Sequence, residues 1–460
     1  MEIKSCLEVH PKTGEVIGAN SIHLADWVLE QMSVACVVET GELLMYHNGR
    51  YVPHGHEMIH GIMVEALKEH TKHGGQAVYS RHLFGEVIDV IKGKRYKPLE
   101  AFDQDPHVIN MQNGLYNTKT MELEPHSPEY YSRVQIPVAF DKDATCPTIE
   151  KVCSWLMRPE DLTKAYEFIG YCLYKEYPLQ KMFILFGPGG TGKSIFIKLA
   201  RTFLGEENCS AVSLHDLDID RFASSDLYGK LMNECADIGD ELIKNTGHIK
   251  SLVGDGDKIR AQRKNERAFG FHNHAKLLFS ANALPPVRDD TTGWYRRPEI
   301  IPFMRVITSE EYTQHKDEFE RMASVEELSG LFNKVVPLLN ELLRRGKFTN
   351  ETDWATTEQV YKAASNPEGT FLDMFVSNEA NEMIEKRALY DYYSKFCEKI
   401  GARPLTMIRF SKYINDVVGW CPRCLDPSKE RANLGGKTAV VWRDTFFDVA
   451  AWAEWEKSNQ

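Results

Sequence analysis

The chain has 460 residues, of which 43% are hydrophobic and 26% charged, a composition typical of globular proteins and long enough for about three domains. No apolar run approaches the roughly 18 residues of a membrane-spanning helix, and the start, MEIKSCLEVHPKTGE, lacks the pattern of a signal peptide. The net charge of −11 excludes a surface that attracts nucleic acid everywhere, although it permits a local basic groove.

The cysteines and histidines give no metal-site pattern. The ten cysteines are scattered, and we expect reduced thiols in a cytoplasmic protein. Cys421 and Cys424 have the spacing of zinc ligands, but no second pair lies nearby. His54, His56 and His60 cluster in what we interpret as a polar surface loop.

Taken in chain order, the predicted elements change character several times. Residues 1–140 mix strand-like runs with a helical pattern at 57–73, and helical periodicity continues through 147–178. From 182 to about 303, strand-like runs alternate with helical or polar segments, which predicts an α/β sheet. A long helix at 325–348 contains Pro337, where we expect a kink, and 349–357 reads as a linker. The last hundred residues show two helical patterns and then two short runs around Gly435 and Gly436.

A glycine-rich segment between a predicted strand (183–186) and a predicted helix (194–203) matches G-x-x-x-x-G-K-[ST]. It consists of Gly187, Pro188, Gly189, Gly190, Thr191, Gly192, Lys193 and Ser194. Glycines let backbone N–H groups approach phosphate oxygens, and the helix N-terminus adds a positive dipole end. Lys193 is expected to reach the β- and γ-phosphates, and the Ser194 hydroxyl to ligate Mg²⁺. The segment therefore predicts a nucleoside triphosphate site.

An acidic segment, LMNECADIGDEL, follows at the end of a second predicted strand. One carboxylate should hold Mg²⁺ through water and another should polarise the attacking water. We favour Asp237 for the metal side and Asp240 or Glu241 for a supporting role, with Glu234 as the competing candidate.

Two further polar features complete the predicted site. Asn282 lies at the tip of the strand predicted at 276–279, where a neutral amide can orient water or bind the γ-phosphate. Arg296 and Arg297 could extend a cationic finger to the γ-phosphate of a neighbouring subunit, or form an ordinary ion pair.

A basic run lies between the acidic segment and Asn282. Its cations are Lys258, Arg260, Arg263, Lys264 and Arg267. In an acidic chain this local field suits a hairpin that contacts the phosphate backbone of a nucleic acid; a solvated charged face is the alternative.

In this order, the motifs resemble those of superfamily 3 helicases of the poxvirus, phage and plasmid primase-helicase type. The resemblance covers nearly the whole chain. It rests on INMQNGLYNTKTMELEPHSPEY, VAFDKDATCP, FILFGPGGTGKS, LYGKLMNECADIGDE, HIKSLVGDGDKIRAQRK, AKLLFSANALP and WYRRPEIIPF. The family often has Asn where this chain has Thr191.

The resemblance implies an AAA+ ATPase core that assembles as a ring, commonly a hexamer, with ATP between subunits and hairpins that grip one DNA strand. It makes Lys193 and Ser194 ligands of ATP and Mg²⁺. Asp237 becomes the metal-side acid, and Asn282 the sensor. Arg297, or else Arg296, becomes the finger, and Lys264 with Arg263 the DNA-gripping pair.

The C-terminal piece resembles a winged-helix domain, with KRALYDYYSKFCEKIG as first helix, MIRFSKYINDVVG as recognition-like helix and Gly435-Gly436 in the wing. Arg409, Lys412, Lys437 and Arg443 would contact phosphates, unless this piece only packs and never meets DNA. The expected fold is thus α/β. The expected domains, in chain order, are an α+β N-terminal domain (1–140), a helical collar (141–180), an AAA+ core (181–305), a helical lid (306–350) and a winged-helix domain (351–460).

The predicted function is ATP-dependent DNA unwinding in replication of a phage, plasmid or integrated mobile element. Single-stranded and forked DNA are the expected partners, and a separate primase is left open. DLDID at 216–220 imitates the aspartates of a primase, but we expect no primer synthesis. A DNA-binding initiator ATPase that does not unwind processively is the first alternative, and a metabolic P-loop kinase is the second.

Overall fold

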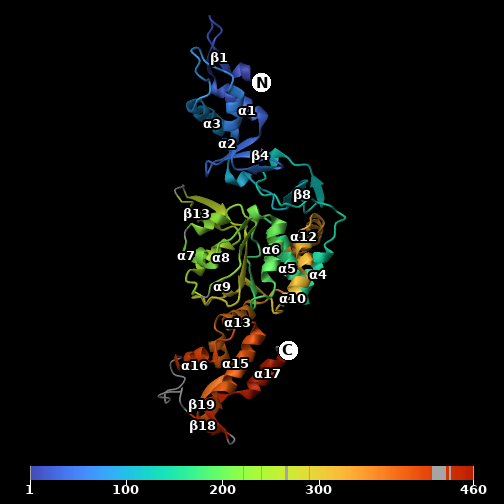
Figure 1. The fold of residues 1–460 in the computed structure, drawn as a ribbon, viewed down its shortest axis with the longest axis vertical. Helices are drawn as coiled ribbons and strands as arrows, with labels where there is room; N and C mark the ends of the chain where they lie inside the picture. The colour runs from blue at the N-terminus through green and yellow to red at the C-terminus, as the bar shows by residue number, and fades with distance from the viewer. Residues whose placement is uncertain are drawn as a thin grey trace.

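The computed structural model describes residues 2–458 except 221, 240, 265–267, 290, 417–430 and 435–436. Figure 1 shows three bodies along the long axis of the molecule. We call residues 2–102 the N-terminal module, residues 103–365 the central module and residues 366–458 the C-terminal module. Within the described part of the chain, none of the helices combines the length and the apolar character that crossing a membrane requires.

The N-terminal module is a mixed α/β unit with its own core. Its apolar centre joins residues from Cys6 to Ile91. The elements are β1 (Leu7–Val9), β2 (Val16–Ala19), α1 (Ser21–Gln31), β3 (Val34–Val37), β4 (Leu43–His47), β5 (Arg50–Val52), α2 (Gly55–Leu67), α3 (Arg81–Arg95) and β6 (Tyr96–Lys97). The interpretation of His56 and His60 as loop residues is wrong, because both lie on α2, where their rings contact the Phe84 ring edge-on.

A five-stranded parallel sheet forms the centre of the molecule. Its strands stand in the order β11 (Cys209–Ser210), β12 (Met232–Cys235), β15 (Lys276–Ala281), β10 (Met182–Phe186) and β16 (Pro298–Pro302). All residues of β10 and β15 are buried, which explains the unbroken apolar run of β10 and the apolar residues 277–279 of β15. The predicted α/β sheet is confirmed, and Asn282 follows the last residue of β15.

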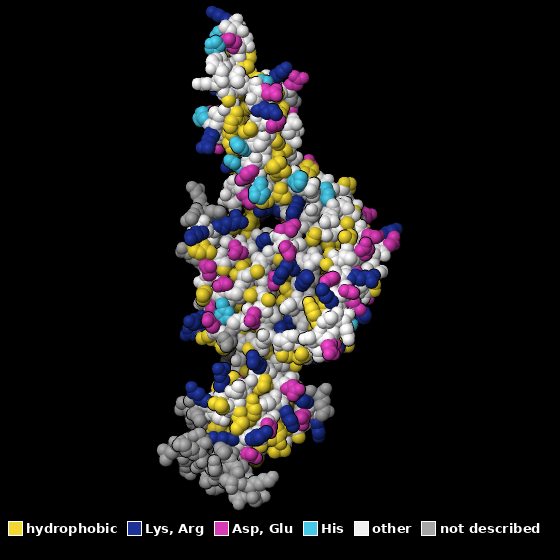
Figure 2. All heavy atoms as spheres, in the orientation of Figure 1, with side chains coloured by type: hydrophobic (Ala, Val, Ile, Leu, Met, Phe, Trp, Pro, Cys, Tyr) yellow, Lys and Arg dark blue, Asp and Glu magenta, His cyan; other side chains and the backbone are white. Residues whose placement is uncertain are grey.

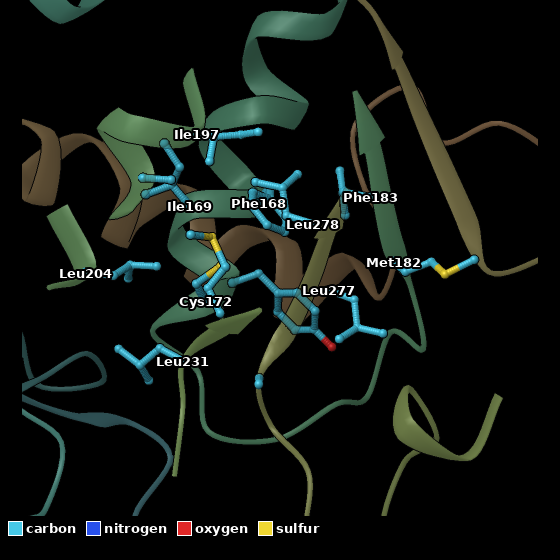
Figure 3. Packing of buried hydrophobic residues seen from close by; sticks show 14 of the residues in the cluster. Phe168, Ile169, Cys172, Met182, Phe183, Ile197, Leu204, Leu231, Leu277 and Leu278 are labelled. Atoms are coloured by element: carbon cyan, nitrogen blue, oxygen red, sulfur yellow. The ribbon is translucent and has the colours of Figure 1, made fainter. Parts of the chain in front are cut away.

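Helices surround this sheet, and most of them share one core with it. They are α4 (Pro147–Leu156), α5 (Pro159–Cys172), α6 (Lys193–Leu204), α7 (Leu214–Ile219), α8 (Thr246–Leu252), α9 (Thr292–Tyr295), α10 (Ser309–Gln314), α11 (Lys316–Arg321), α12 (Val325–Arg345) and α13 (Trp354–Ser365). Figure 3 shows side chains of α5 and α6 packed against those of β10 and β15. Each fully buried aliphatic or aromatic side chain contributes about 1.5–3 kcal/mol, so this cluster supplies most of the stability of the central module.

Two predictions about the segment after the sheet need comment. The long helix predicted at 325–348 is confirmed as far as Arg345, because α12 continues through Pro337 as a single element. The kink expected at Pro337 stays a prediction. The linker predicted at 349–357 is wrong from Trp354 onward, because Asp353 caps α13 by accepting hydrogen bonds from the backbone N–H groups of Ala355 and Thr356.

The remaining elements lie at the two ends of the central module. Strands β7 (Val108–Met111), β8 (Gly114–Asn117) and β9 (Glu122–Glu124) form a meander, and β13 (Lys258–Ala261) and β14 (Phe269–His272) form a hairpin. The C-terminal module consists of α14 (Pro367–Phe375), β17 (Val376–Glu385), α15 (Lys386–Ile400), α16 (Met407–Asp416), β18 (Arg431–Leu434), β19 (Lys437–Phe447) and α17 (Val449–Ser458). The prediction that α15 is its first helix is wrong, because α14 and β17 precede it.

A buried ion cluster ties the sheet to α5. The carboxylate of Glu299 on β16 is fully buried and accepts from Lys164 Nζ at 3.0 Å and from Lys181 Nζ at 2.8 Å. Lys181 also pairs with Glu351 at 3.0 Å. Since buried charges are tolerated only when they are paired, this cluster fixes how β16, β10 and α5 meet.

We predict that Glu299→Gln lowers the free energy of unfolding by about 3–5 kcal/mol, because it leaves two buried ammonium groups without their shared counter-charge. Urea denaturation followed by tryptophan fluorescence measures the change. Glu326→Gln, at an exposed position in the first turn of α12, is the matched control. Equal urea midpoints for the two variants would contradict the proposed role of the cluster.

Candidate functional site

The loop between β10 and α6 requires glycine at three positions. Gly187, Gly190 and Gly192 have φ values of 149°, 79° and 88°. A Cβ on Gly187 would lie 2.1 Å from the Phe303 carbonyl oxygen, and one on Gly192 would lie 2.4 Å from Leu156 Cδ2. The glycines therefore allow a backbone path that passes close to β16 and α4, which no other residue could follow without strain.

Hydrogen bonds fix the loop, one within the loop itself and one from the segment after β16. Thr191 is buried, and its hydroxyl donates to the Pro188 carbonyl at 3.0 Å. The backbone N–H of Ile307 donates to the Gly190 carbonyl at 2.8 Å, so the segment after β16 braces the loop. Ser194 is exposed at the second position of α6.

Lys193 connects the loop to the neighbouring strand. Its buried ammonium donates to the carbonyl oxygens of Gly187 at 2.5 Å and Pro188 at 2.8 Å, and to Asn282 Oδ1 at 3.0 Å. Burial lowers the pKa of Lys193, while the negative charge of Asp237 opposes that shift. The side chain is thus held among oxygen atoms at the carboxyl edge of the sheet.

Strand order brings the acidic side chain to the same edge. Because β15 stands between β10 and β12, Asn282 lies between Lys193 and Asp237. The N–H of Gly187 donates to the Ala281 carbonyl at 3.1 Å, and the N–H of Ile238 donates to the Ser280 carbonyl at 3.0 Å. Asp237 is exposed at this edge.

Of the other acidic candidates, Glu234 and Glu241 do not line the cavity that Asp237 lines. Glu234 is buried and forms an ion pair with Arg201 on α6; burial raises its pKa, and Arg201 opposes the shift. Glu241 is exposed, and its backbone carbonyl lies 2.8 Å from His215 Nε2. Asp240 is outside the described residues.

A cavity of about 620 Å³ runs along this edge. Asp237, Ser280 and Asn282 line it together with the loop, and so does a segment that the sequence analysis did not single out. That segment comprises Ile307, Thr308, Ser309, Tyr312 and Thr313. Its one local signal is a capping box, in which Thr308 and Glu311 exchange side-chain to backbone hydrogen bonds.

The donor set at this edge fits a polyphosphate and a hard cation. A loop whose glycines leave no Cβ, a lysine ammonium and a helix N-terminus together form an anion-binding cradle. The Ser194 hydroxyl and the Asp237 carboxylate are oxygen ligands of the kind Mg²⁺ prefers.

The predicted arginine pair lies at the opposite end of the sheet. The Met182 N–H donates to the Arg297 carbonyl at 2.9 Å, so this residue stands beside the first residue of β10, roughly 17 Å along the strand from the loop. Arg297 is 8% exposed, and its guanidinium donates to the Gly293 carbonyl. Arg296 is exposed and donates to Gln180 Oε1 at 2.9 Å. Neither arginine lines the cavity.

The predicted basic run forms the hairpin β13–β14. Ile259 and Ala261 are buried, whereas Lys258 and Arg260 alternate with them and are exposed. Lys264 is exposed beyond β13. Arg263 is half-buried, with its guanidinium 6.0 Å from the centre of the Tyr228 ring. Arg267 is outside the described residues, and Figure 2 shows dark blue side chains near that hairpin.

In the C-terminal module, α16 presents Arg409 and Lys412 to solvent while Phe410 and Ile414 are buried. The side chains of Lys437 and Arg443 are not described. The predicted wing glycines, Gly435 and Gly436, and the cysteine pair, Cys421 and Cys424, lie outside the described residues.

Two family models match separate parts of the chain. One, described as "D5 N terminal like", matches residues 23–157. The other, "Family of unknown function (DUF5906)", matches residues 185–297, which run from β10 to Arg297.

Two viral proteins share sequence with the chain. "Putative helicase L207/L206" of Acanthamoeba polyphaga mimivirus is 24% identical over 226 residues, which is 45% of this chain and 22% of that protein. "Putative helicase 184R" of Invertebrate iridescent virus 6 is 24% identical over 226 residues, which is 44% of this chain and 23% of that protein. The match thus spans less than a quarter of either relative's length.

Solved structures give weak similarity. The A form apo structure of the NrS-1 C terminal region aligns with a TM-score of 0.42 and 13% identity over 92% of this chain and 98% of that one. A second apo structure of that region aligns with a TM-score of 0.43 and 12% identity over 92% and 99%. Scores this low add nothing to the assignment of the site.

We predict that Gly187→Ala destabilises the protein by about 1–3 kcal/mol, because its Cβ would collide with the carbonyl of Phe303, the residue that follows β16. Gly189→Ala is the matched control, since a Cβ there meets no atom within 4 Å. Chemical denaturation of both variants measures the difference. Equal stabilities would show that the loop can move away from β16 at little cost.

Proposed function

We propose that the chain is an ATP-dependent DNA helicase of superfamily 3 that acts in replication of a phage, plasmid or integrated mobile element. One observation carries the proposal: Lys193, Asn282 and Asp237 meet beside a glycine loop at the carboxyl edge of a parallel sheet. The D5 N-terminal-like match and the helicase names of two viral relatives support the nucleic-acid part.

Each side chain of the site has a distinct role. The loop amides and Lys193 would bind the phosphates of ATP, and Ser194 and Asp237 would hold Mg²⁺, which would supply positive charge beside the phosphates. Asn282 orients the attacking water as a neutral amide. Because Lys193 already donates to Asn282 Oδ1 at 3.0 Å, a phosphate that drew the ammonium away would free this oxygen for water.

The arginine pair completes the site of a neighbouring subunit. A finger must reach beyond its own chain, and Arg296 is exposed, whereas Arg297 is buried against Gly293. Arg296 is therefore the better placed to reach the γ-phosphate, with Arg297 supporting it. This arrangement requires a ring, for which we propose a hexamer with an AAA+ core.

The hairpin grips single-stranded DNA. Lys258, Arg260 and Lys264 project from an apolar base formed by Ile259, Ala261 and the rings of Phe269 and Phe271. In a chain of net charge −11, these three cations form a local positive field that attracts a phosphate backbone.

The C-terminal module has the order helix, strand, helix, helix, strand, strand, helix, and its sheet runs β17-β19-β18. This order supports a winged-helix domain, in which Arg409 and Lys412 on α16 contact DNA phosphates. The domain limits expected from the sequence are part of this proposal.

Lys193→Ala is predicted to reduce ATP hydrolysis at least a hundredfold, because the variant loses the cation that faces the phosphates. Release of inorganic phosphate measures it. Lys198→Ala, an exposed lysine further along α6, is the control and should hydrolyse ATP at the unmodified rate. Normal turnover by the Lys193 variant would reject the site.

Lys264→Glu is expected to abolish stimulation of hydrolysis by DNA and displacement of a strand from a fork, while basal hydrolysis continues. Lys142→Glu, which makes the same charge change at another exposed position, should leave all three unchanged. Strand displacement on a labelled fork gives the readout. If the unmodified protein hydrolyses ATP but never separates the strands, it is an initiator rather than a helicase.

A further inference from the structure

A short basic–aromatic segment lies on the N-terminal module, away from the hairpin and the glycine loop. It consists of Lys94, Arg95, Tyr96 and Lys97, which join the end of α3 to the edge strand β6. Lys94, Arg95 and Tyr96 are exposed, and the tyrosine is 52% exposed. The segment therefore exposes an aromatic ring directly after Arg95 in an acidic chain.

The backbone holds this segment in a fixed position. Strand β6 pairs with β3 alone, at the end of the sheet β5-β4-β3-β6, and the N–H of Val38 donates to the Lys97 carbonyl at 3.0 Å. Lys94 forms an ion pair with Asp26 on α1. Cations at a helix C-terminus and lysines on an edge strand are common. Neither explains a large aromatic ring held open to solvent among them.

Successive ring and cation contacts lead from this segment to the DNA-gripping hairpin. Lys97 Nζ lies 4.8 Å from the centre of the Tyr131 ring, which packs against Phe102 at 5.7 Å. Arg133 lies 5.8 Å from the Phe102 ring and 5.1 Å from the Tyr228 ring, and it donates to the Tyr228 hydroxyl.

The last contacts in this series belong to the hairpin itself. The Tyr228 ring meets Phe269 and Phe271 of β14 at 5.2 and 5.6 Å. The basic–aromatic segment and the hairpin therefore flank the same junction between the N-terminal and central modules.

We propose that the basic–aromatic segment is a second contact for single-stranded nucleic acid, in which a base stacks on the Tyr96 ring and Arg95 contacts a phosphate. Stacking on an exposed ring flanked by cations is how proteins hold unpaired strands without reading their sequence. The contact at Tyr96 does not depend on the proposed function. The further step, that the same bound strand continues to the hairpin, rests on the proposed function.

The test is the affinity for a fluorescent oligothymidylate, measured by anisotropy without nucleotide across a series of salt concentrations. Tyr96→Ala should weaken binding about tenfold with an unchanged salt slope, because it removes a stacking surface and no charge. Arg95→Ala should weaken binding and reduce the slope by about 0.7, the loss of one phosphate contact to a single strand. Tyr96→Trp should bind as the unmodified chain does, which separates loss of stacking from loss of folding.

Lys68→Ala is the control for Arg95→Ala, because it removes one positive charge at another exposed position of the same module. It should change neither the affinity nor the slope. Unchanged binding by Tyr96→Ala, or equal weakening by Tyr96→Ala and Tyr96→Trp, would overturn the inference.

The Lys264→Glu variant, measured in the same way, separates this inference from the proposed function. Full affinity in that variant together with weak binding by Tyr96→Ala would reject the hairpin and keep the second contact. The reverse pattern would reject the second contact alone. Cross-linking of an iodouracil-containing oligonucleotide to the peptide that carries Tyr96 supports direct contact, and failure to cross-link that peptide speaks against it.

Discussion

The parallel pairing of β15 between β10 and β12 is the constraint on which the site depends. It places the end of one strand, where Asn282 stands, between the strand that leads to Lys193 and the strand that leads to Asp237. The Lys193–Asn282 hydrogen bond of 3.0 Å is a consequence of this register. A shift of the register by one residue would turn each side chain to the other face and separate all three groups.

Buried charge secures that register from the other end of the strands. Glu299 holds Lys164 and Lys181 where β10 and β16 begin, and Lys276, at the start of β15, donates to the carbonyl oxygens of Tyr174, Glu176 and His274. Burial lowers the pKa of Lys276 to about 7. Polar groups that must be satisfied inside a protein accept few arrangements, so these contacts select one alignment of the strands.

The same end of the sheet carries the features that point toward nucleic acid. The hairpin extends from it, and the N-terminal module joins it through Arg133 and Tyr228 and through an ion pair of 2.9 Å between Arg50 and Glu207. The proposed nucleotide site and the proposed nucleic-acid contacts are thus separated by the length of the strands. Any coupling between them would pass through β12 and β15, whose far ends hold Asp237 and Asn282.

Local rules were enough to predict the glycine loop, the apolar strands and the positions of Lys193, Ser194 and Asn282 from the sequence. These rules are the φ freedom of glycine, the burial of strands and the ending of a strand before proline. Among the acidic candidates, it favoured Asp237 without excluding Glu234. Tertiary structure placed Glu234 beside Arg201 and left Asp237 at the cavity. The sequence of β12 could not predict this, because the partner of Glu234 lies on a different element, α6. Tertiary structure also placed residues 307–312 beside the loop and the Tyr228 ring beside Arg133. These residues are far apart in the chain, and only the packing of the modules brings them into contact.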